Sequence, residues 1–84
     1  MRLEFDPHAW EDILFWKKTD RKKLAKIMRL LSSIESNPTK GIGKPELLKH
    51  ELSGCWSRRI DRQHRVVYKI GGEEVLILSC RYHY

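Results

Sequence analysis

The chain has 84 residues, of which 40% are hydrophobic and 33% are charged, and its formal net charge is +6. This length is enough for one domain, residues 1–84, and too short for two, while the composition excludes a disordered tail. No apolar run approaches the length of a membrane span, and the first ten residues lack the apolar stretch of a signal peptide, so we expect a cytoplasmic protein.

The positive charge favours a nucleic acid or an acidic protein as the partner. Cys55 and Cys80 are expected to stay reduced and to pack as small apolar residues, because nothing in the sequence indicates export. The four histidines share no metal-ligand spacing with these cysteines, so a zinc site is not expected.

Residues 1–5 alternate apolar and charged side chains, which predicts a short strand. Asp6 can cap the free N–H groups of a helix that begins at Pro7 and runs to about Lys18. The expected inner stripe of this helix consists of Trp10, Ile13 and Leu14, with the aliphatic stem of Lys17 as a further candidate.

A second helix is predicted for residues 21–35, with Asp20 as its cap and Asn37-Pro38 as its end. Its apolar residues recur at helical spacing and are Leu24, Ile27, Met28, Leu31 and Ile34. The opposite face is rich in lysine and arginine. We interpret it as solvated surface that is able to contact RNA phosphates, rather than as a dedicated site.

Residues 39–54 are predicted to be irregular, because they contain glycines and a proline. Glu46 lies in this segment among three lysines, Lys40, Lys44 and Lys49. A carboxylate in such surroundings is a candidate for chemistry at a phosphate. The plainer interpretation is a surface loop with a solvent-screened ion pair.

Three strands are predicted for residues 55–60, 64–70 and 74–82, and Gly71-Gly72 is a strong signal for a hairpin between the last two. The element order β-α-α-β-β-β predicts an α+β domain, in which two helices pack on one face of a small, mostly antiparallel sheet. The other face, which carries the arginines, is then free.

The predicted free face gathers candidates for RNA chemistry: Glu46, Lys49, Arg58, Arg59, Arg65, His83 and Tyr84. Cleavage of RNA through its own 2′-hydroxyl needs a base, an acid for the departing 5′ oxygen, and cations for the pentavalent phosphorus. Glu46 can be the base and His83 the acid, while Arg65 and Lys49 supply the cations. Tyr84 can stack on a nucleobase or position His83. This route needs no metal and no cofactor.

Two alternatives stay open at this point. His83 has the plainer interpretation of a solvated chain end. The basic face can also act as a non-catalytic clamp for RNA or for an acidic protein. Glu46 and His83 distinguish the two functions, because a clamp gains nothing from a carboxylate that repels phosphate.

Four segments give a more specific indication: KPELLKHELSG at 44–54, WSRRI at 56–60, HRVVY at 64–68 and CRYHY at 80–84. Together they resemble the YoeB toxins of the RelE superfamily, and the similarity extends along the whole chain. The resemblance implies an endoribonuclease of a type II toxin–antitoxin system, an mRNA interferase that cuts codons in the A site of the 70S ribosome. It also implies inhibition by a YefM-like antitoxin, and it leaves a homodimer open.

The resemblance carries roles over to individual positions of this sequence. Glu46 matches the general base and Arg65 the arginine that stabilises the transition state. His83 matches the proposed general acid and Tyr84 its neighbour that contacts the substrate. Two further positions, Lys49 and Arg59, match residues that bind substrate phosphate.

The sequence departs from the family pattern at two positions. Cys55 stands where relatives have an aromatic residue, and Gln63 replaces an acidic residue near Arg65. Neither departure removes a proposed catalytic group.

One geometrical requirement follows from the hairpin. A tight turn at Gly71-Gly72 places Arg65 and His83 on opposite faces of the sheet, because side chains alternate along each strand. Bringing both to one site requires a three-residue loop, a bulge, or a tail that leaves the strand before His83. We expect the bulge or the bent tail.

Overall fold

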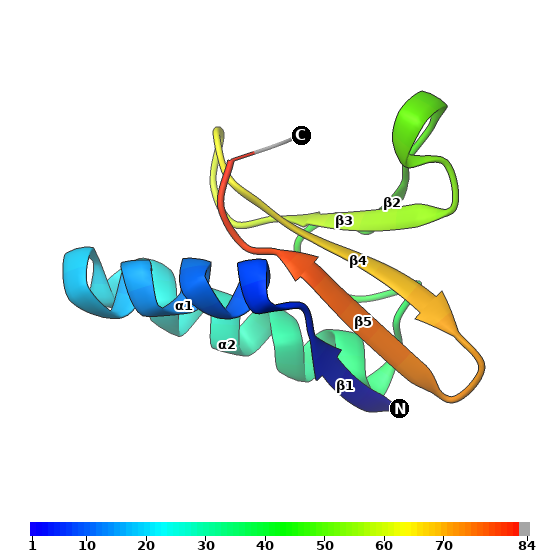
Figure 1. Cartoon of the computed structure of the whole chain (residues 1–84), viewed down its shortest axis with the longest axis horizontal. Helices are drawn as coiled ribbons and strands as arrows, with labels where there is room; N and C mark the ends of the chain where they lie inside the picture. Colours follow the sequence, from blue (N-terminus) through cyan, green and yellow to red (C-terminus); the bar gives the residue numbers. More distant parts are fainter. Residues whose placement is uncertain (83–84) are drawn as a thin grey trace.

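The computed structural model describes residues 1–82, and Figure 1 shows how its helices and strands are arranged. The α-helices are α1 (Pro7–Thr19) and α2 (Arg21–Ser36), and a short 3-10 helix, η1, covers His50–Leu52. The strands are β1 (Arg2–Phe5), β2 (Glu46–Leu47), β3 (Cys55–Arg59), β4 (Arg65–Gly71) and β5 (Glu74–Ser79). In the part of the chain that the structure describes, no helix is long and apolar enough to cross a lipid bilayer.

The five strands form one sheet in the order β1-β5-β4-β3-β2. Neighbouring strands are antiparallel except β1 and β5, which are parallel. The two α-helices lie side by side on one side of this sheet (Figure 1). The predicted α+β fold with a mostly antiparallel sheet is therefore confirmed.

Local sequence signals define both helices as predicted. The carboxylate of Asp6 accepts a hydrogen bond from the His8 N–H at 2.9 Å and so caps α1. Asp20 caps α2 by accepting from the N–H groups of Lys22 and Lys23. The helix ends at Asn37, as expected.

The core fills the space between the helices and the sheet. Its buried members are Ala9, Ile13, Trp16, Ile27, Leu30, Leu31, Ile34, Ile60, Val66, Tyr68, Val75, Ile77 and Cys80. Cys55 and Cys80 are both buried free thiols, which confirms their expected packing role. Burial, with the nearby Asp12 carboxylate, raises the pKa of the Cys80 thiol to about 12, so this thiol stays protonated.

The predicted inner stripe of α1 is wrong except for Ile13. Trp10 and Leu14 are 52% and 42% exposed, whereas Asp12 and Trp16 are buried. Both buried residues bond to the backbone of Cys80: the Asp12 carboxylate accepts from its N–H at 2.9 Å, and the Trp16 indole donates to its carbonyl at 2.8 Å. Contacts with the far end of the chain thus decide which face of α1 turns inward.

In α2, Met28 is 45% exposed instead of buried, and Leu30 takes a core position that the predicted stripe omitted. The rest of that predicted stripe is buried or partly buried against the core.

The segment 39–54 is not wholly irregular, contrary to the prediction. Glu46 and Leu47 form the edge strand β2, in which Glu46 pairs with Ser57 and Leu47 with Trp56. The sequence did not predict this strand, because two residues are too few to show an alternating pattern. The pairing places Glu46, the predicted base, at a fixed position on the sheet.

The β4–β5 hairpin contains the expected bulge. Its two-residue loop is Gly72-Glu73, with Gly71 opposite Glu74, and Tyr68 faces Ile77. One step further, Val67 faces Ser79, so Leu78 is the extra residue. Beyond the bulge, odd-numbered positions of β4 lie opposite odd-numbered positions of β5. This is the register that the proposed site requires. β5 also ends at Ser79 and not at Tyr82 as predicted.

Arg58 is the main correction to the predicted free face. It is 0% exposed and points toward the helices, so the expectation that it binds RNA on the open face is wrong. Side chains alternate along β3, and Arg58 shares its face with the half-buried Trp56 and the buried Ile60. A position on the core side follows from that alternation.

The buried guanidinium of Arg58 is held by five acceptors. Its Nε donates to the Tyr68 hydroxyl at 3.0 Å, and Nη1 donates to Ser33 Oγ at 2.6 Å. The remaining bonds go to the carbonyls of Asn37, Lys40 and Ile42. A Cβ at Gly41 would lie 2.9 Å from Nη1, so the glycine in this loop makes room for the guanidinium. Arg58 therefore fixes the path of the chain between α2 and β2.

We predict that Arg58→Ala lowers the free energy of unfolding by about 3–5 kcal/mol, because truncation leaves buried carbonyl and hydroxyl groups without a donor. Arg59→Ala is the matched control at the next, exposed position, and it should change this free energy by less than about 0.5 kcal/mol. Urea denaturation followed by circular dichroism measures both. Equal losses in the two variants would contradict the anchoring role of Arg58.

Candidate active site

The open face of the sheet brings Glu46, Ser57 and Arg65 together from three strands. Arg65 Nη1 on β4 donates to Glu46 Oε1 on β2 at 2.9 Å and to Ser57 Oγ on β3 at 3.1 Å. The Glu46 side chain is 59% exposed and that of Arg65 is 23% exposed. A carboxylate and a guanidinium are therefore held side by side on a surface that a large ligand can reach.

A small apolar cluster stiffens this face. Leu48, Cys55 and Val67 are buried on it, and Leu52 and Leu78 pack against them. Cys55, one of the two departures from the family pattern, is thus a packing residue. Gln63 is the other departure. Arg65 does not need an acidic residue at that position, because Glu46 and Ser57 hold the Arg65 side chain.

Lys49 and Arg59 are the two further residues that are predicted to bind substrate phosphate. Lys49 is exposed where the chain passes from β2 into η1, and it lines a 380 Å³ hollow with His50 and Leu52. Within residues 1–82, it makes no hydrogen bond or ion pair with Glu46. Arg59 is exposed directly opposite Arg65 in the β3–β4 register. The structure thus places both predicted phosphate-binding residues on accessible surface, and it places Arg59 directly beside Arg65.

A basic groove continues from Arg59. It has a volume of about 390 Å³ and is lined by Lys26, Lys44, Arg59 and Arg62, together with Asp61. The loop beside it is held by the Arg59 N–H, which donates to the Gly43 carbonyl at 2.7 Å.

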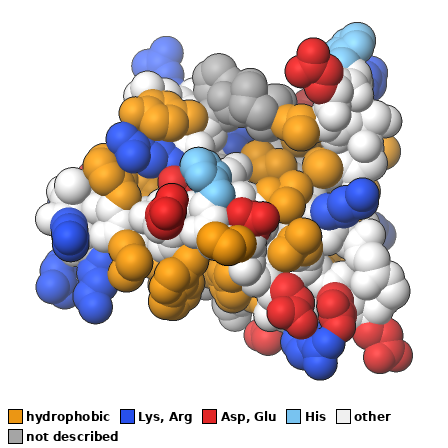
Figure 2. Space-filling view, viewed as in Figure 1, with side chains coloured by type: hydrophobic (Ala, Val, Ile, Leu, Met, Phe, Trp, Pro, Cys, Tyr) orange, Lys and Arg blue, Asp and Glu red, His pale blue; other side chains and the backbone are white. Residues whose placement is uncertain are grey.

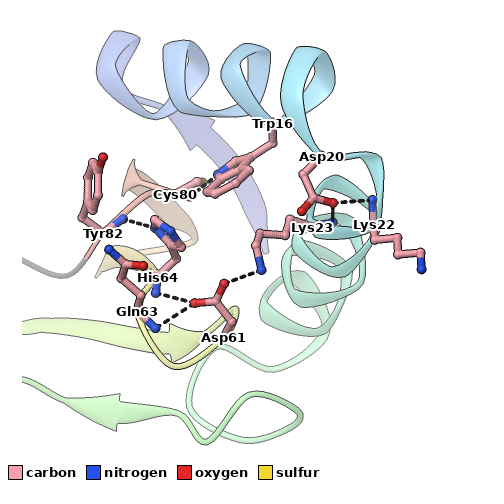
Figure 3. A network of polar contacts seen from close by, with 9 residues as sticks. All are labelled: Trp16, Asp20, Lys22, Lys23, Asp61, Gln63, His64, Cys80 and Tyr82. Atoms are coloured by element: carbon pink, nitrogen blue, oxygen red, sulfur yellow. Dashed lines mark hydrogen bonds and ion pairs between the residues drawn. The ribbon is translucent and has the colours of Figure 1, made fainter.

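The chain after β5 returns to Arg65. The N–H of Arg65 donates to the Tyr82 carbonyl at 3.0 Å, and the N–H of Tyr82 donates to His64 Nδ1 at 2.7 Å. Figure 3 shows the His64 ring between Trp16 and Tyr82. The predicted site residues His83 and Tyr84 lie outside the described residues, but the described chain ends beside Arg65.

The turn that leads into β4 is built on Asp61 (Figure 3). Its Oδ1 accepts from the N–H groups of Gln63 and His64, and its Oδ2 pairs with the Lys23 ammonium of α2. Burial raises the pKa of Asp61, but the hydrogen bonds from Lys23 and the two backbone groups outweigh burial and hold this pKa at about 2. The pKa of Lys23 is raised, chiefly by its hydrogen bond to Asp61.

Sequence analysis did not name Ser57, His64 or Tyr82 as site residues. Ser57 shares a strand face with Arg59, and the alternation along β3 was available to find it. No local signal identified His64 and Tyr82, because their contact joins positions 18 residues apart across a bulge and a bent tail.

Comparison with known proteins identifies the family of this chain. A family model described as the YoeB-like toxin of bacterial type II toxin–antitoxin systems matches residues 5–84. The chain belongs to the YoeB-like toxins. Toxin RelK of Mycobacterium tuberculosis is 57% identical over 82 residues, which cover 98% of this YoeB-like chain and 96% of that protein.

Solved structures agree with the family assignment. A YoeB/ParE toxin from Agrobacterium tumefaciens is 40% identical, with a TM-score of 0.94 and 100% coverage of both chains. Staphylococcus aureus YoeB has been solved as a dimer and in a heterotetrameric complex with YefM, each 45% identical to this YoeB-like toxin. The TM-scores are 0.89 and 0.88, and coverage is 100% of this chain and 98% of theirs.

The lowered pKa of Asp61 predicts a pH-dependent stability of the turn. Because folding lowers this pKa from 3.8 to about 2, the stabilisation is complete above the unfolded pKa and is lost as the pH falls toward 2. Asp61→Asn should lower the free energy of unfolding by about 2 kcal/mol at neutral pH, and this deficit should shrink between about pH 4 and pH 2.

Urea unfolding across that pH range measures the Asp61→Asn deficit, with Glu11→Gln on the exposed surface of α1 as the control. The control should change the free energy of unfolding by less than about 0.5 kcal/mol at each pH. A deficit that stays constant down to pH 2 would show that Asp61 acts without its charge.

Proposed function

We propose that this toxin is an endoribonuclease that cleaves mRNA in the A site of the 70S ribosome by metal-independent attack of the 2′-hydroxyl, and thereby inhibits translation. The observation that carries the proposal is the Glu46–Arg65 pair at 2.9 Å on an open, cationic face. The pair combines a carboxylate that can accept a proton with a guanidinium that can bind phosphate. A protein that only bound RNA would gain nothing from the carboxylate.

In the proposed reaction, Glu46 takes the proton of the 2′-hydroxyl and the resulting oxygen attacks the adjacent phosphorus. The bond from phosphorus to the 5′ oxygen breaks, and His83 gives its proton to that leaving oxygen. The products are a 2′,3′-cyclic phosphate and a 5′-hydroxyl. Arg65, with Lys49 and Arg59, neutralises the charge on the pentavalent phosphorus.

The ion pair in the free protein suggests how the site becomes active. Arg65 is bonded to both Glu46 and Ser57, so a phosphate that enters must compete for the guanidinium. When Arg65 turns to the phosphate, the Glu46 carboxylate is released beside the neighbouring 2′-hydroxyl. The same arginine thus binds the substrate and frees the base.

The shallow, open site also supports the need for the ribosome. The Glu46 side chain is 59% exposed. A free RNA strand that binds such an open surface loses conformational entropy, and the toxin alone offers little to compensate for that loss. An mRNA held in the ribosomal A site is already oriented. We therefore propose that the ribosome supplies the substrate geometry while the toxin supplies the base, the acid and the charge.

A YefM-like antitoxin is the proposed protein partner, in line with the S. aureus complex. We propose that an acidic segment of the antitoxin covers Arg59 and Arg65 and so blocks access to phosphate. Arg58 is excluded from this contact because it is buried. A homodimer, the form solved for the S. aureus toxin, is a further proposed assembly.

Glu46→Gln tests the base. The amide keeps the shape of the side chain and an oxygen that can accept from Arg65, but it cannot take a proton. We expect the cleavage rate on ribosome-bound mRNA to fall by about a hundred- to ten-thousandfold, while ribosome binding is retained. Single-turnover cleavage mapped by primer extension measures the rate, and Glu73→Gln in the exposed hairpin loop is the control. Cleavage at the wild-type rate would eliminate Glu46 as the base.

Deletion of His83 and Tyr84 tests the acid and its neighbour. The fold should persist, because the anchoring bonds of Cys80 and Tyr82 belong to residues that remain. Cleavage should be lost and ribosome binding kept. Circular dichroism and co-sedimentation with ribosomes accompany the cleavage assay. A folded truncation that cuts normally would refute a catalytic role for these residues and favour the static clamp.

A further inference from the structure

His64 is buried at the point where the chain enters β4, whereas His8 and His50 are exposed. Its ring packs edge-on against Trp16, with ring centroids 4.8 Å apart, and lies 5.1 Å from the Tyr82 ring. The backbone N–H of His64 donates to Asp61 Oδ1 at 2.7 Å, which fixes the residue in the turn. The imidazole is therefore held from several sides, as Figure 3 shows.

The ring of His64 and the backbone of Arg65 together hold Tyr82. His64 Nδ1 accepts the Tyr82 N–H at 2.7 Å, and the Arg65 N–H donates to the Tyr82 carbonyl at 3.0 Å. Tyr82 has a φ of 59°, a left-handed conformation that a bulky residue adopts only when its surroundings impose it. These two bonds supply that constraint.

We propose that His64 is a positioning residue for the proposed cleavage reaction: it fixes Tyr82 and so sets the point from which the proposed acid is presented to the Glu46–Arg65 pair. This inference rests on the proposed function. His64 does not touch the substrate; it acts through the chain that it holds. The consecutive residues His64 and Arg65 then serve both halves of the site, since the Arg65 side chain meets the phosphate and the two together hold the tail.

The required state of the ring is specific. A ring nitrogen can accept the Tyr82 N–H only if it carries no proton, so the neutral ring bears its proton on Nε2. Asparagine carries its amide oxygen on the same carbon that bears Nδ1 in histidine, so it can replace the acceptor. Leucine has a similar bulk at this position and no acceptor.

The experiment compares His64→Leu, His64→Asn and the control His8→Leu, which removes an exposed imidazole from α1. Single-turnover cleavage of ribosome-bound mRNA and the Kd for ribosomes are measured for each. We expect His64→Leu to cleave about ten- to a hundredfold more slowly with an unchanged Kd, because a misplaced tail impairs the chemical step and not binding. His64→Asn should recover most of the rate, and His8→Leu should match the wild type.

NMR of the free toxin provides a readout independent of activity. In the wild type we expect a slowly exchanging Tyr82 amide and a ¹⁵N shift of His64 Nδ1 typical of an unprotonated acceptor. The Tyr82 amide should exchange rapidly in His64→Leu and slowly in His64→Asn. Melting temperatures show whether each variant is folded, and His64→Asn keeps the test decisive if His64→Leu unfolds.

Three results would overturn the inference. One is cleavage by folded His64→Leu at the rate of the His8→Leu control. Another is a parallel loss of rate and ribosome affinity that His64→Asn does not rescue, which would make the role purely structural. The third is a Tyr82 amide that exchanges rapidly in the wild type. A wild-type toxin that does not cleave at all would instead refute the proposed function, and the NMR comparison would still decide whether His64 holds Tyr82.

Discussion

The structure depends on a buried positive charge that is stabilised by hydrogen bonds to neutral dipoles. The guanidinium of Arg58 bonds to a tyrosine hydroxyl, a serine hydroxyl and three carbonyls, and in the described chain it has no carboxylate partner. A planar group with five N–H donors is suited to this arrangement, and a charge so deep is tolerable only if every donor is used. The three carbonyls belong to the loop after α2, so that loop is fixed by one side chain of β3.

The position of Glu46 follows from this constraint. The loop that Arg58 holds ends at Ile42, and the edge strand β2 begins four residues later. A two-residue strand is weak by itself, but its pairing with Ser57 and Trp56 and the fixed loop before it leave little freedom. The base and the arginine of the proposed site meet on one face because Arg58 is sequestered on the other. The neighbouring arginines of WSRRI thus differ in their surroundings, since Arg58 is buried and holds the loop, whereas Arg59 is exposed beside Arg65.

Features with a local cause could be predicted from the sequence, and those with a distant cause could not. Asp6 and Asp20 cap helices through bonds to residues two or three positions away, and Gly72 makes a turn within the hairpin. The inward face of α1 is set instead by Cys80, 68 residues from Asp12. Glu46, Arg65, Lys49 and Arg59 were placed on an accessible face, whereas the burial of Arg58 was missed although alternation with Trp56 and Ile60 indicated it. The roles of these accessible residues in catalysis and phosphate binding, like those of His83 and Tyr84, stay predictions.

The strand order has a consequence for how the chain folds during its synthesis. β5 is synthesised after every other strand, yet it lies between β1 and β4 and is the only described strand that pairs with β1. The first strand to leave the ribosome therefore has no partner until the last one follows. The core is closed by contacts of long sequence separation, as between Asp12 and Cys80, which can form only after Cys80 has been synthesised. The sheet and the core of this topology are therefore completed only once β5 and Cys80 have been made.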